Sequence, residues 1–175
     1  QSPLFVAESF VTDTINVGGT AAPAFVDIDN DGDKDLFVGK HNGTISFYRN
    51  SGSPTTFTPT LVTNAFLNIS IGGDPNLTPT FSDYNNDGNF DLFFGTQDGH
   101  LHFYENIGTP ADAQFVFRTD RFADVAPTQD TAPAFVDTDG DGDQDLLVGV
   151  RKGGLYYYRN NRIGTFAPVT LEIPS

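Results

Sequence analysis

The 175-residue chain contains no cysteine, methionine or tryptophan, and only 9 of its residues are lysine or arginine. Without cysteine it can form neither a disulfide framework nor a thiolate metal site, and it has no cysteine nucleophile. Acidic residues number 23, which gives a formal net charge of −14. Because such a chain repels phosphate backbones and anionic membrane surfaces, we expect no nucleic acid partner. Apolar runs are only a few residues long, so we expect no membrane insertion.

Glutamate is also scarce, since 20 of the 23 acidic residues are aspartate. Helices favour glutamate, whereas aspartate tends to bond the backbone of turns. The 18 glycines and 11 prolines indicate many turns as well, and no window has a capped 3.6-residue apolar period. The 23 aromatic residues argue against disorder. The sequence therefore predicts one ordered domain, over residues 1–175, with almost no helix.

An internal repeat organises the chain. Its three copies occupy residues 21–50, 77–106 and 131–160, and copies one and three share 18 of 30 positions without a gap. In copy one, apolar and aromatic runs predict strands at 24–26, 36–38 and 44–48, with Asn42-Gly43 as a hairpin turn. A fourth extended segment follows around Phe57. Four strands in about 55 residues, repeated, are typical of β-propeller blades.

Phenylalanine-bearing outer segments outnumber the blade cores by one. They lie near residues 4–14, 56–63, 114–122 and 165–173. Either terminal segment could therefore complete a blade. We expect an all-β fold of three four-stranded blades, which forms half of a six-bladed ring or a fragment of a larger propeller.

Nine-residue acidic loops join the first two expected strands of each copy and hold 13 of the 23 acidic residues. Oxygen-bearing side chains stand at positions one, three, five and nine, with glycine at six, which suits a hard cation with many oxygen ligands such as Ca²⁺. Position seven can supply its backbone carbonyl, so we expect its side chain to point outward. The candidate metal residues are Asp27, Asp29, Asp31, Asp33 and Asp35; Asp83, Asn85, Asp87, Asn89 and Asp91; and Asp137, Asp139, Asp141, Asp143 and Asp145.

The acidic loops differ from the other common calcium loops. An EF-hand requires glutamate at position twelve and flanking helices, but position twelve here falls in the expected strands, as at Val38. Solvated acidic turns are the simpler alternative, although four or five carboxylates in one short loop repel each other strongly without a cation. We expect about one Ca²⁺ per repeat and three per chain. The loop of copy two has three carboxylates rather than five, so its site should be the weakest.

The chain resembles the FG-GAP or VCBS repeats of integrin α-subunit propellers and many bacterial surface proteins. The resemblance lies in Ala22-Pro23, in the loop at 27–35 and in Leu36-Phe37-Val38-Gly39, together with their counterparts. It implies β-propeller blades with Ca²⁺ in the hairpin between the first two strands. Such propellers usually close with about seven blades, so three require a second chain or the rest of a longer protein.

Two sets of aromatic and histidine residues have alternative interpretations. Phe25, Phe81 and Phe135, with three matching tyrosines, could stack on sugars, but recurrence in every copy favours packing between blades. The tyrosines are Tyr48, Tyr104 and Tyr158. The three histidines, His41, His100 and His102, are not repeated, and we expect them at the surface.

For function, we expect a non-catalytic, calcium-binding recognition or adhesion module of a secreted or cell-surface protein. The sequence lacks a GxSxG elbow, and its carboxylates are committed to metal. Three alternatives remain: a carbohydrate-binding lectin, the accessory propeller of a secreted polysaccharide-degrading enzyme, and an excised or engineered half-propeller without a ligand. The expected partner is a second copy that closes a six-bladed ring, or the rest of a longer propeller, with a protein or carbohydrate ligand.

Overall fold

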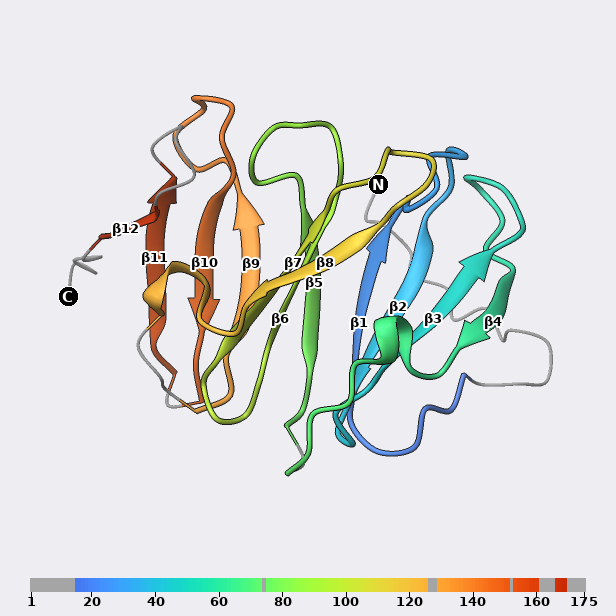
Figure 1. Cartoon of the computed structure of the whole chain (residues 1–175), viewed down its shortest axis with the longest axis horizontal. Helices are drawn as coiled ribbons and strands as arrows, with labels where there is room; N and C mark the ends of the chain where they lie inside the picture. Colours follow the sequence, from blue (N-terminus) through green and yellow to red (C-terminus); the bar gives the residue numbers. More distant parts are fainter. Residues whose placement is uncertain (1–14, 74, 126–128, 152, 161–165, 170–175) are drawn as a thin grey trace, which may run out of the picture.

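The computed structural model describes residues 15–73, 75–125, 129–151, 153–160 and, for the backbone alone, 166–169. Within these residues, each copy of the repeat folds into its own antiparallel four-stranded sheet. Figure 1 shows the three sheets side by side. Strand order follows the sequence in every sheet, so neighbouring strands are joined by short hairpins. The expectation of an all-β fold is confirmed.

The first sheet contains β1 (Ala21–Val26), β2 (Asp35–Lys40), β3 (Ile45–Asn50) and β4 (Pro59–Thr63). The first three strands are longer than the apolar runs that predicted them, and the fourth begins two residues after Phe57. Gly43 has a φ of +80° in the hairpin turn between β2 and β3, a conformation that glycine adopts without strain.

The other two sheets repeat this plan. The second contains β5 (Thr78–Ser82), β6 (Asp91–Gly95), β7 (Leu101–Asn106) and β8 (Phe115–Thr119). The third contains β9 (Ala132–Val136), β10 (Asp145–Gly149), β11 (Leu155–Asn160) and β12 (Phe166–Val169). In the described part of the chain, the only helical elements are two short 3-10 turns, η1 (Phe66–Asn68) and η2 (Phe122–Asp124). The expected outer segment at 4–14 lies outside the described residues.

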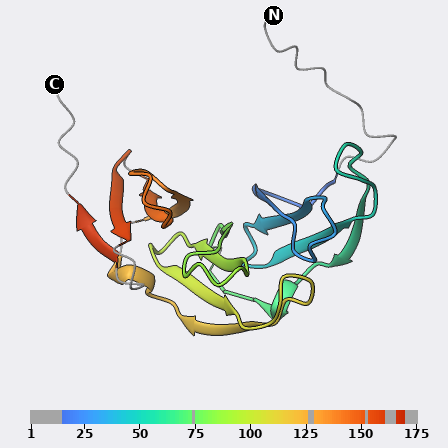
Figure 2. The ribbon, with the colours of Figure 1, turned by 90° about the horizontal axis from the view of Figure 1, so that it is seen from above.

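The sheets are arranged as an open arc. Figure 2 shows β1, β5 and β9 on the concave side and β4, β8 and β12 on the convex side. We call each sheet a blade and number the blades one to three along the chain. Blade two therefore has a neighbour on both faces, whereas blades one and three each have one face that no other described blade covers.

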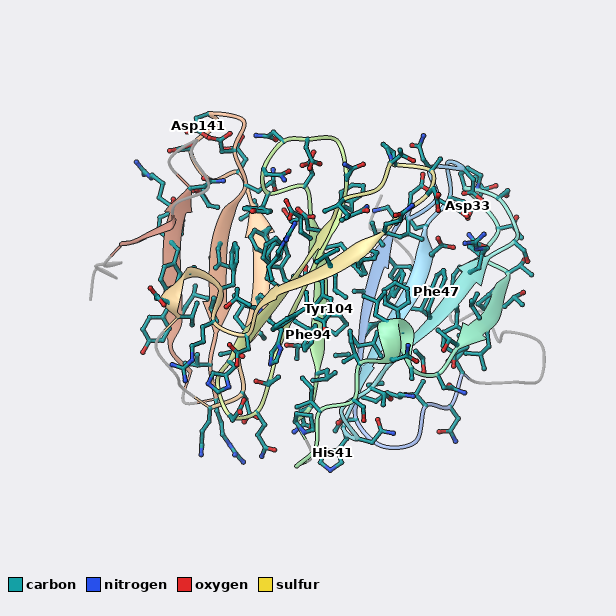
Figure 3. The ribbon with its side chains drawn as sticks, in the orientation of Figure 1. Asp33, His41, Phe47, Phe94, Tyr104 and Asp141 are labelled. Carbon is teal, nitrogen blue, oxygen red and sulfur yellow. The ribbon has the colours of Figure 1, made fainter. Side chains whose placement is uncertain are left out.

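The hydrophobic core lies between the blades. One cluster joins blades one and two around Phe37, and a second joins blades two and three around Phe93. Both phenylalanines are completely buried, and Figure 3 shows Phe47 and Phe94 within this interior. Phe81 and Phe135 pack against the preceding blade as expected, but Phe25 is 52% exposed. The expectation is wrong for Phe25 because no blade precedes it among the described residues.

All three histidines are half-buried, rather than fully exposed at the surface as expected. His41 Nδ1 lies 2.7 Å from the Asn76 side-chain oxygen, and His100 Nδ1 lies 3.0 Å from an Asp98 carboxylate oxygen. His102 instead stacks on Phe94 with ring centroids 4.7 Å apart, and burial lowers the pKa of its imidazole. A helix that is long and apolar enough to cross a membrane is not found in the described residues.

Candidate metal centre

The acidic loops connect the first two strands of each blade, as the sequence predicts. Residues 27–35 join β1 to β2, residues 83–91 join β5 to β6, and residues 137–145 join β9 to β10. In Figure 3, Asp33 and Asp141 lie at one rim of the arc, whereas His41 lies at the opposite rim. The repeat therefore places its carboxylates on a single edge of the molecule.

The first aspartate of each loop organises the backbone. Asp27 accepts hydrogen bonds from the N–H groups of Asp31 (3.1 Å) and Gly32 (3.0 Å). Asp83 and Asp137 also accept two backbone N–H bonds each, including one from the glycine at position six. That glycine has a φ of +90° to +94° in all three loops, which explains its recurrence.

The loop turns bring their carboxylates together. One oxygen from each of Asp27, Asp29 and Asp31 lies within 4.8 Å of the others, and the same holds for the corresponding aspartates of the third loop. These are Asp137, Asp139 and Asp141. Oxygens that share a Ca²⁺ lie about 2.3–2.6 Å from it, and thus at most about 5 Å from each other. Both groups therefore have the spacing of a shared cation site.

The aspartate at position nine is buried and ties each loop to the third strand of its blade. Asp35, Asp91 and Asp145 are at most 1% exposed. One oxygen of each accepts the backbone N–H at the end of the third strand, at 2.7, 2.7 and 2.8 Å respectively. The donors are Asn50, Asn106 and Asn160. The aspartate at position nine therefore holds the loop against the sheet through one oxygen, and its second oxygen is left for other contacts.

The side chains at position seven are buried, so the expectation that they face outward is wrong. Asp33, Asn89 and Asp143 are 7%, 9% and 7% exposed. The turn explains this, because the N–H of position seven donates to the carboxylate of position five, at 3.1 Å from Asp33 to Asp31. The side chain is therefore available as an inward-facing oxygen donor in addition to the backbone carbonyl.

Several oxygens in the first two loops are buried and unsatisfied. Buried polar oxygens nearly always have a hydrogen-bond partner, and leaving one unpaired is costly. Within the described part of the chain, five oxygens of these loops have none: Oδ1 of Asp29, Asp33 and Asn89, and Oδ2 of Asp35 and Asp91. They belong to positions three, seven and nine. A cation with oxygen ligands would satisfy them together.

The electrostatics of the two loops favour the same interpretation. Burial raises the pKa of Asp35 to about 6 and that of Asp91 to about 7. Burial also raises the pKa of Asp33, and the neighbouring carboxylates of its loop raise it further. Without a cation, ionisation of these carboxyl groups is therefore less favourable than in a free aspartate, and a bound cation would reverse that preference.

The third loop differs at position nine. Oδ2 of Asp145 accepts hydrogen bonds from the Thr138 hydroxyl and, at 3.0 Å, from the Tyr157 hydroxyl. Burial by itself raises the pKa of Asp145, but the hydrogen bonds from Thr138, Asn160 and Tyr157 bring it below its usual value. Copies one and two carry apolar or aromatic residues in place of this threonine and phenylalanine in place of this tyrosine.

Sequence reasoning missed two arginines beside the loops. Arg49 on β3 contacts Asp29 at 3.1 Å, and Arg159 on β11 contacts Asp139 at 3.5 Å. In copy two the loop has Asn85 at this position, and the corresponding strand residue is Glu105, which pairs with Arg118 instead. The sequence did contain this signal. The two copies with aspartate at loop position three carry arginine on the third strand, and the copy with asparagine at that position carries glutamate instead.

Comparison with known proteins agrees with the geometry. The model of the FG-GAP-like repeat matches residues 27–94 and again residues 83–148. The chain belongs to the FG-GAP-like repeat family. Each match begins at the first aspartate of a loop and runs into the second strand of the next blade, so the family pattern includes all three acidic loops. The search of curated proteins found no match to the chain.

Proposed function

We propose that the chain is a non-catalytic, calcium-binding β-propeller module that serves in recognition or adhesion outside the cell. The observation that carries the calcium site is loop one, where three carboxylates lie within 4.8 Å of each other and buried oxygens of Asp29, Asp33 and Asp35 have no hydrogen-bond partner among the described residues. Their oxygen-only chemistry suits Ca²⁺, and ordinary acidic turns at a solvated surface would not bury them.

The chain's own residues would hold the ion in a defined way. Positions one, three and five supply the grouped carboxylates, position seven adds a buried oxygen, and position nine contributes its second oxygen in the first two loops. A bound ion supplies positive charge that stabilises the folded hairpins. The likeness to the family and the structural use of these carboxylates support a role in binding rather than catalysis.

An extracellular location follows from the expected affinity. Calcium sites in extracellular modules bind with Kd values of about 10⁻⁴–10⁻³ M, and we expect these loops to bind in that range. Such sites would be filled where calcium is abundant. A measured Kd far below this range would argue against the proposed location.

Thermal unfolding with and without calcium tests the proposal. At a Ca²⁺ concentration 100 times Kd, one site adds about 2.7 kcal/mol to the free energy of unfolding. We expect the melting temperature to fall clearly when EDTA replaces Ca²⁺, with Mg²⁺ giving little recovery. A melting temperature that EDTA leaves unchanged would contradict the proposal.

A carbohydrate ligand is the second candidate, and a pocket between blades one and two favours it. The pocket is lined by Asp27, Asn30, Asn106 and Phe90, among others. Its amides and carboxylate can bond hydroxyl groups, and Phe90 is 43% exposed beside them. A glycan array probed in Ca²⁺ and in EDTA tests this, and silence in both conditions would reject it.

A further inference from the structure

Both junctions between blades have the same construction. Between blades one and two, Phe66 and Phe81 pack on Phe37 with ring centroids 5.0 and 4.6 Å away. Between blades two and three, Phe122 and Phe135 pack on Phe93 at 4.8 and 4.5 Å. A backbone hydrogen bond also crosses each junction, from Leu77 N–H to the Lys40 carbonyl (3.3 Å) and from Thr131 N–H to the Thr96 carbonyl (3.2 Å).

A glycine at the end of the second strand makes this close approach possible. A Cβ on Gly39 would lie 2.1 Å from the Leu77 carbonyl oxygen, and a Cβ on Gly95 would lie 2.0 Å from that of Thr131. Gly149 occupies the same place in blade three, yet its nearest neighbour in the described residues would be 3.8 Å from a Cβ. Packing within this chain therefore does not require a glycine at 149.

The two end faces expose residues that the internal junctions bury. On the free face of blade three, Leu155 is 52% exposed, whereas its counterparts Ile45 and Leu101 are 0% and 1% exposed. On the free face of blade one, Phe25 is 52% exposed, whereas Phe81 packs on Phe37. Figure 2 shows these faces at the two ends of the open arc.

We propose that a second copy of this chain covers both faces, with blade one of each copy packing on blade three of the other. The repeat specifies the contacts: Phe25 would pack on Leu147 of the other copy, and Ala21 N–H would donate to its Val150 carbonyl. Gly149 leaves the room that Gly39 and Gly95 leave inside the chain. Closed propellers have about four to eight blades, and six is the only multiple of three in that range, so two copies close the ring.

The first experiment compares alanine variants of glycines by light scattering after size exclusion, in Ca²⁺. The unmodified chain is expected to elute with twice its mass of 19.0 kDa. Gly149→Ala places a methyl group against the partner's backbone and should weaken the dimer on the order of 100-fold, which is two factors of ten in Kd. Its circular dichroism should not change, because the chain itself has room at that position.

Gly72→Ala is the matched control. A Cβ at Gly72 meets open space among the described residues, and Gly72 lies outside both end faces, so this variant should remain a dimer. Gly95→Ala places the same methyl group in an internal junction, where it should destabilise the fold itself. Together, the three variants distinguish a methyl group that clashes with a partner chain, one that clashes within the chain's own fold, and one that clashes with nothing.

A second pair of variants tests the apolar faces directly. Phe25→Asp and Leu155→Asp lie at opposite ends of the arc, and either one alone should give a monomer because each alters both junctions of the ring. Ile107→Asp changes a residue that is 55% exposed in blade two, away from both ends, and should leave the dimer intact.

Three results would overturn the proposal. A 19.0 kDa monomer for the unmodified chain would leave the end faces to another occupant, such as a blade from a longer chain. A dimer that survives Gly149→Ala and Phe25→Asp would have its interface elsewhere. Assemblies that grow beyond two copies would mean that the junction repeats without closing.

Discussion

The first and third acidic loops have the same five aspartates, yet they hold the aspartate at position nine in different ways. In loop one, Oδ2 of Asp35 is buried without a hydrogen-bond partner among the described residues, and burial raises the pKa of this carboxyl group. In loop three, hydroxyl groups of Thr138 and Tyr157 bond the equivalent oxygen of Asp145, and its pKa is lowered. Residues that are not themselves candidate metal ligands therefore decide how strongly an ion-free loop destabilises the fold.

Replacing the position-nine aspartate by asparagine should give the largest difference between the two loops. In EDTA, Asp145→Asn loses two hydroxyl donors and should cost about 1–3 kcal/mol. Asp35→Asn keeps the oxygen that bonds Asn50 and removes an unsatisfied charge, so it should change stability by less than about 0.5 kcal/mol, or increase it. Urea unfolding of both variants measures the difference, and equal losses would contradict it.

The Asp35→Asn variant should behave differently in calcium than in EDTA. Asp35→Asn should lower the affinity of its loop by about tenfold or more, because it removes a charged oxygen ligand. In Ca²⁺ it should therefore be less stable than the unmodified chain, although in EDTA it is not. A variant with the same stability change in both conditions would show that Asp35 does not contribute to an ion site.

The second prediction extends the comparison to loop two, which has three carboxylates and should bind most weakly. Asn85→Asp adds a carboxylate at position three, and we expect its site to gain up to about tenfold in affinity. In EDTA the variant should be less stable, since it loses the 2.9 Å bond from Asn85 to Asp87. Calorimetric titration measures the affinity, and thermal unfolding in EDTA measures the stability. Asn42→Asp adds the same charge in a hairpin turn and serves as the control.

The third prediction concerns pH in the metal-free chain. The pKa of Asp91, about 7, lies above its unfolded value of about 3.9, so the folded state binds more protons between these values. The contribution of Asp91 to stability is therefore present at low pH and is lost as pH rises toward 7. Relative to Asp91→Asn, the unmodified chain in EDTA should lose stability between about pH 4 and pH 7.

Calcium should reverse that trend, because the ion requires the ionised carboxylate. In saturating Ca²⁺ the unmodified chain should gain stability relative to Asp91→Asn as pH rises over the same interval. Melting temperatures of both proteins at the two pH values, with and without Ca²⁺, provide the measurement. Parallel pH profiles in EDTA would show that Asp91 ionises normally.

The smallest effect should come from the arginines beside loops one and three. Arg49 is 50% exposed, and exposed ion pairs contribute at most about 1 kcal/mol. Arg49→Gln and Arg159→Gln should each lower the melting temperature slightly in EDTA and less in Ca²⁺, since the ion then supplies the opposing charge. If the melting temperature falls more in Ca²⁺ than in EDTA, these arginines instead stabilise the calcium-bound form of the loops.

The sequence predicted the fold and the loops because both are written as local repeats. Alternating apolar residues, the Asn42-Gly43 turn and the spacing of Asp27, Asp29 and Asp31 each have a direct structural meaning. What it did not predict depends on contacts between distant segments. The burial of Asp33 follows from the way the turn packs, and the hydroxyl pair at Asp145 combines a loop residue with one from β11.

The exposure of Phe25 was also beyond the sequence. Its repeat equivalence to Phe81 and Phe135 predicts packing between blades, and that prediction is correct wherever a preceding blade exists. Only the arrangement of the three sheets in an open arc shows which copy has no blade before it (Figure 2). The repeat predicts that a residue packs against the preceding blade, whereas the arrangement of the blades in space decides whether such a blade is there.

Calorimetric titration of the unmodified chain with Ca²⁺ tests the central claim most directly. The proposal predicts saturable binding of about one ion per acidic loop, with Kd values of about 10⁻⁴–10⁻³ M and little competition from Mg²⁺. The absence of binding heat at millimolar Ca²⁺, together with unchanged stability in EDTA, would contradict it and leave the loops as solvated acidic turns.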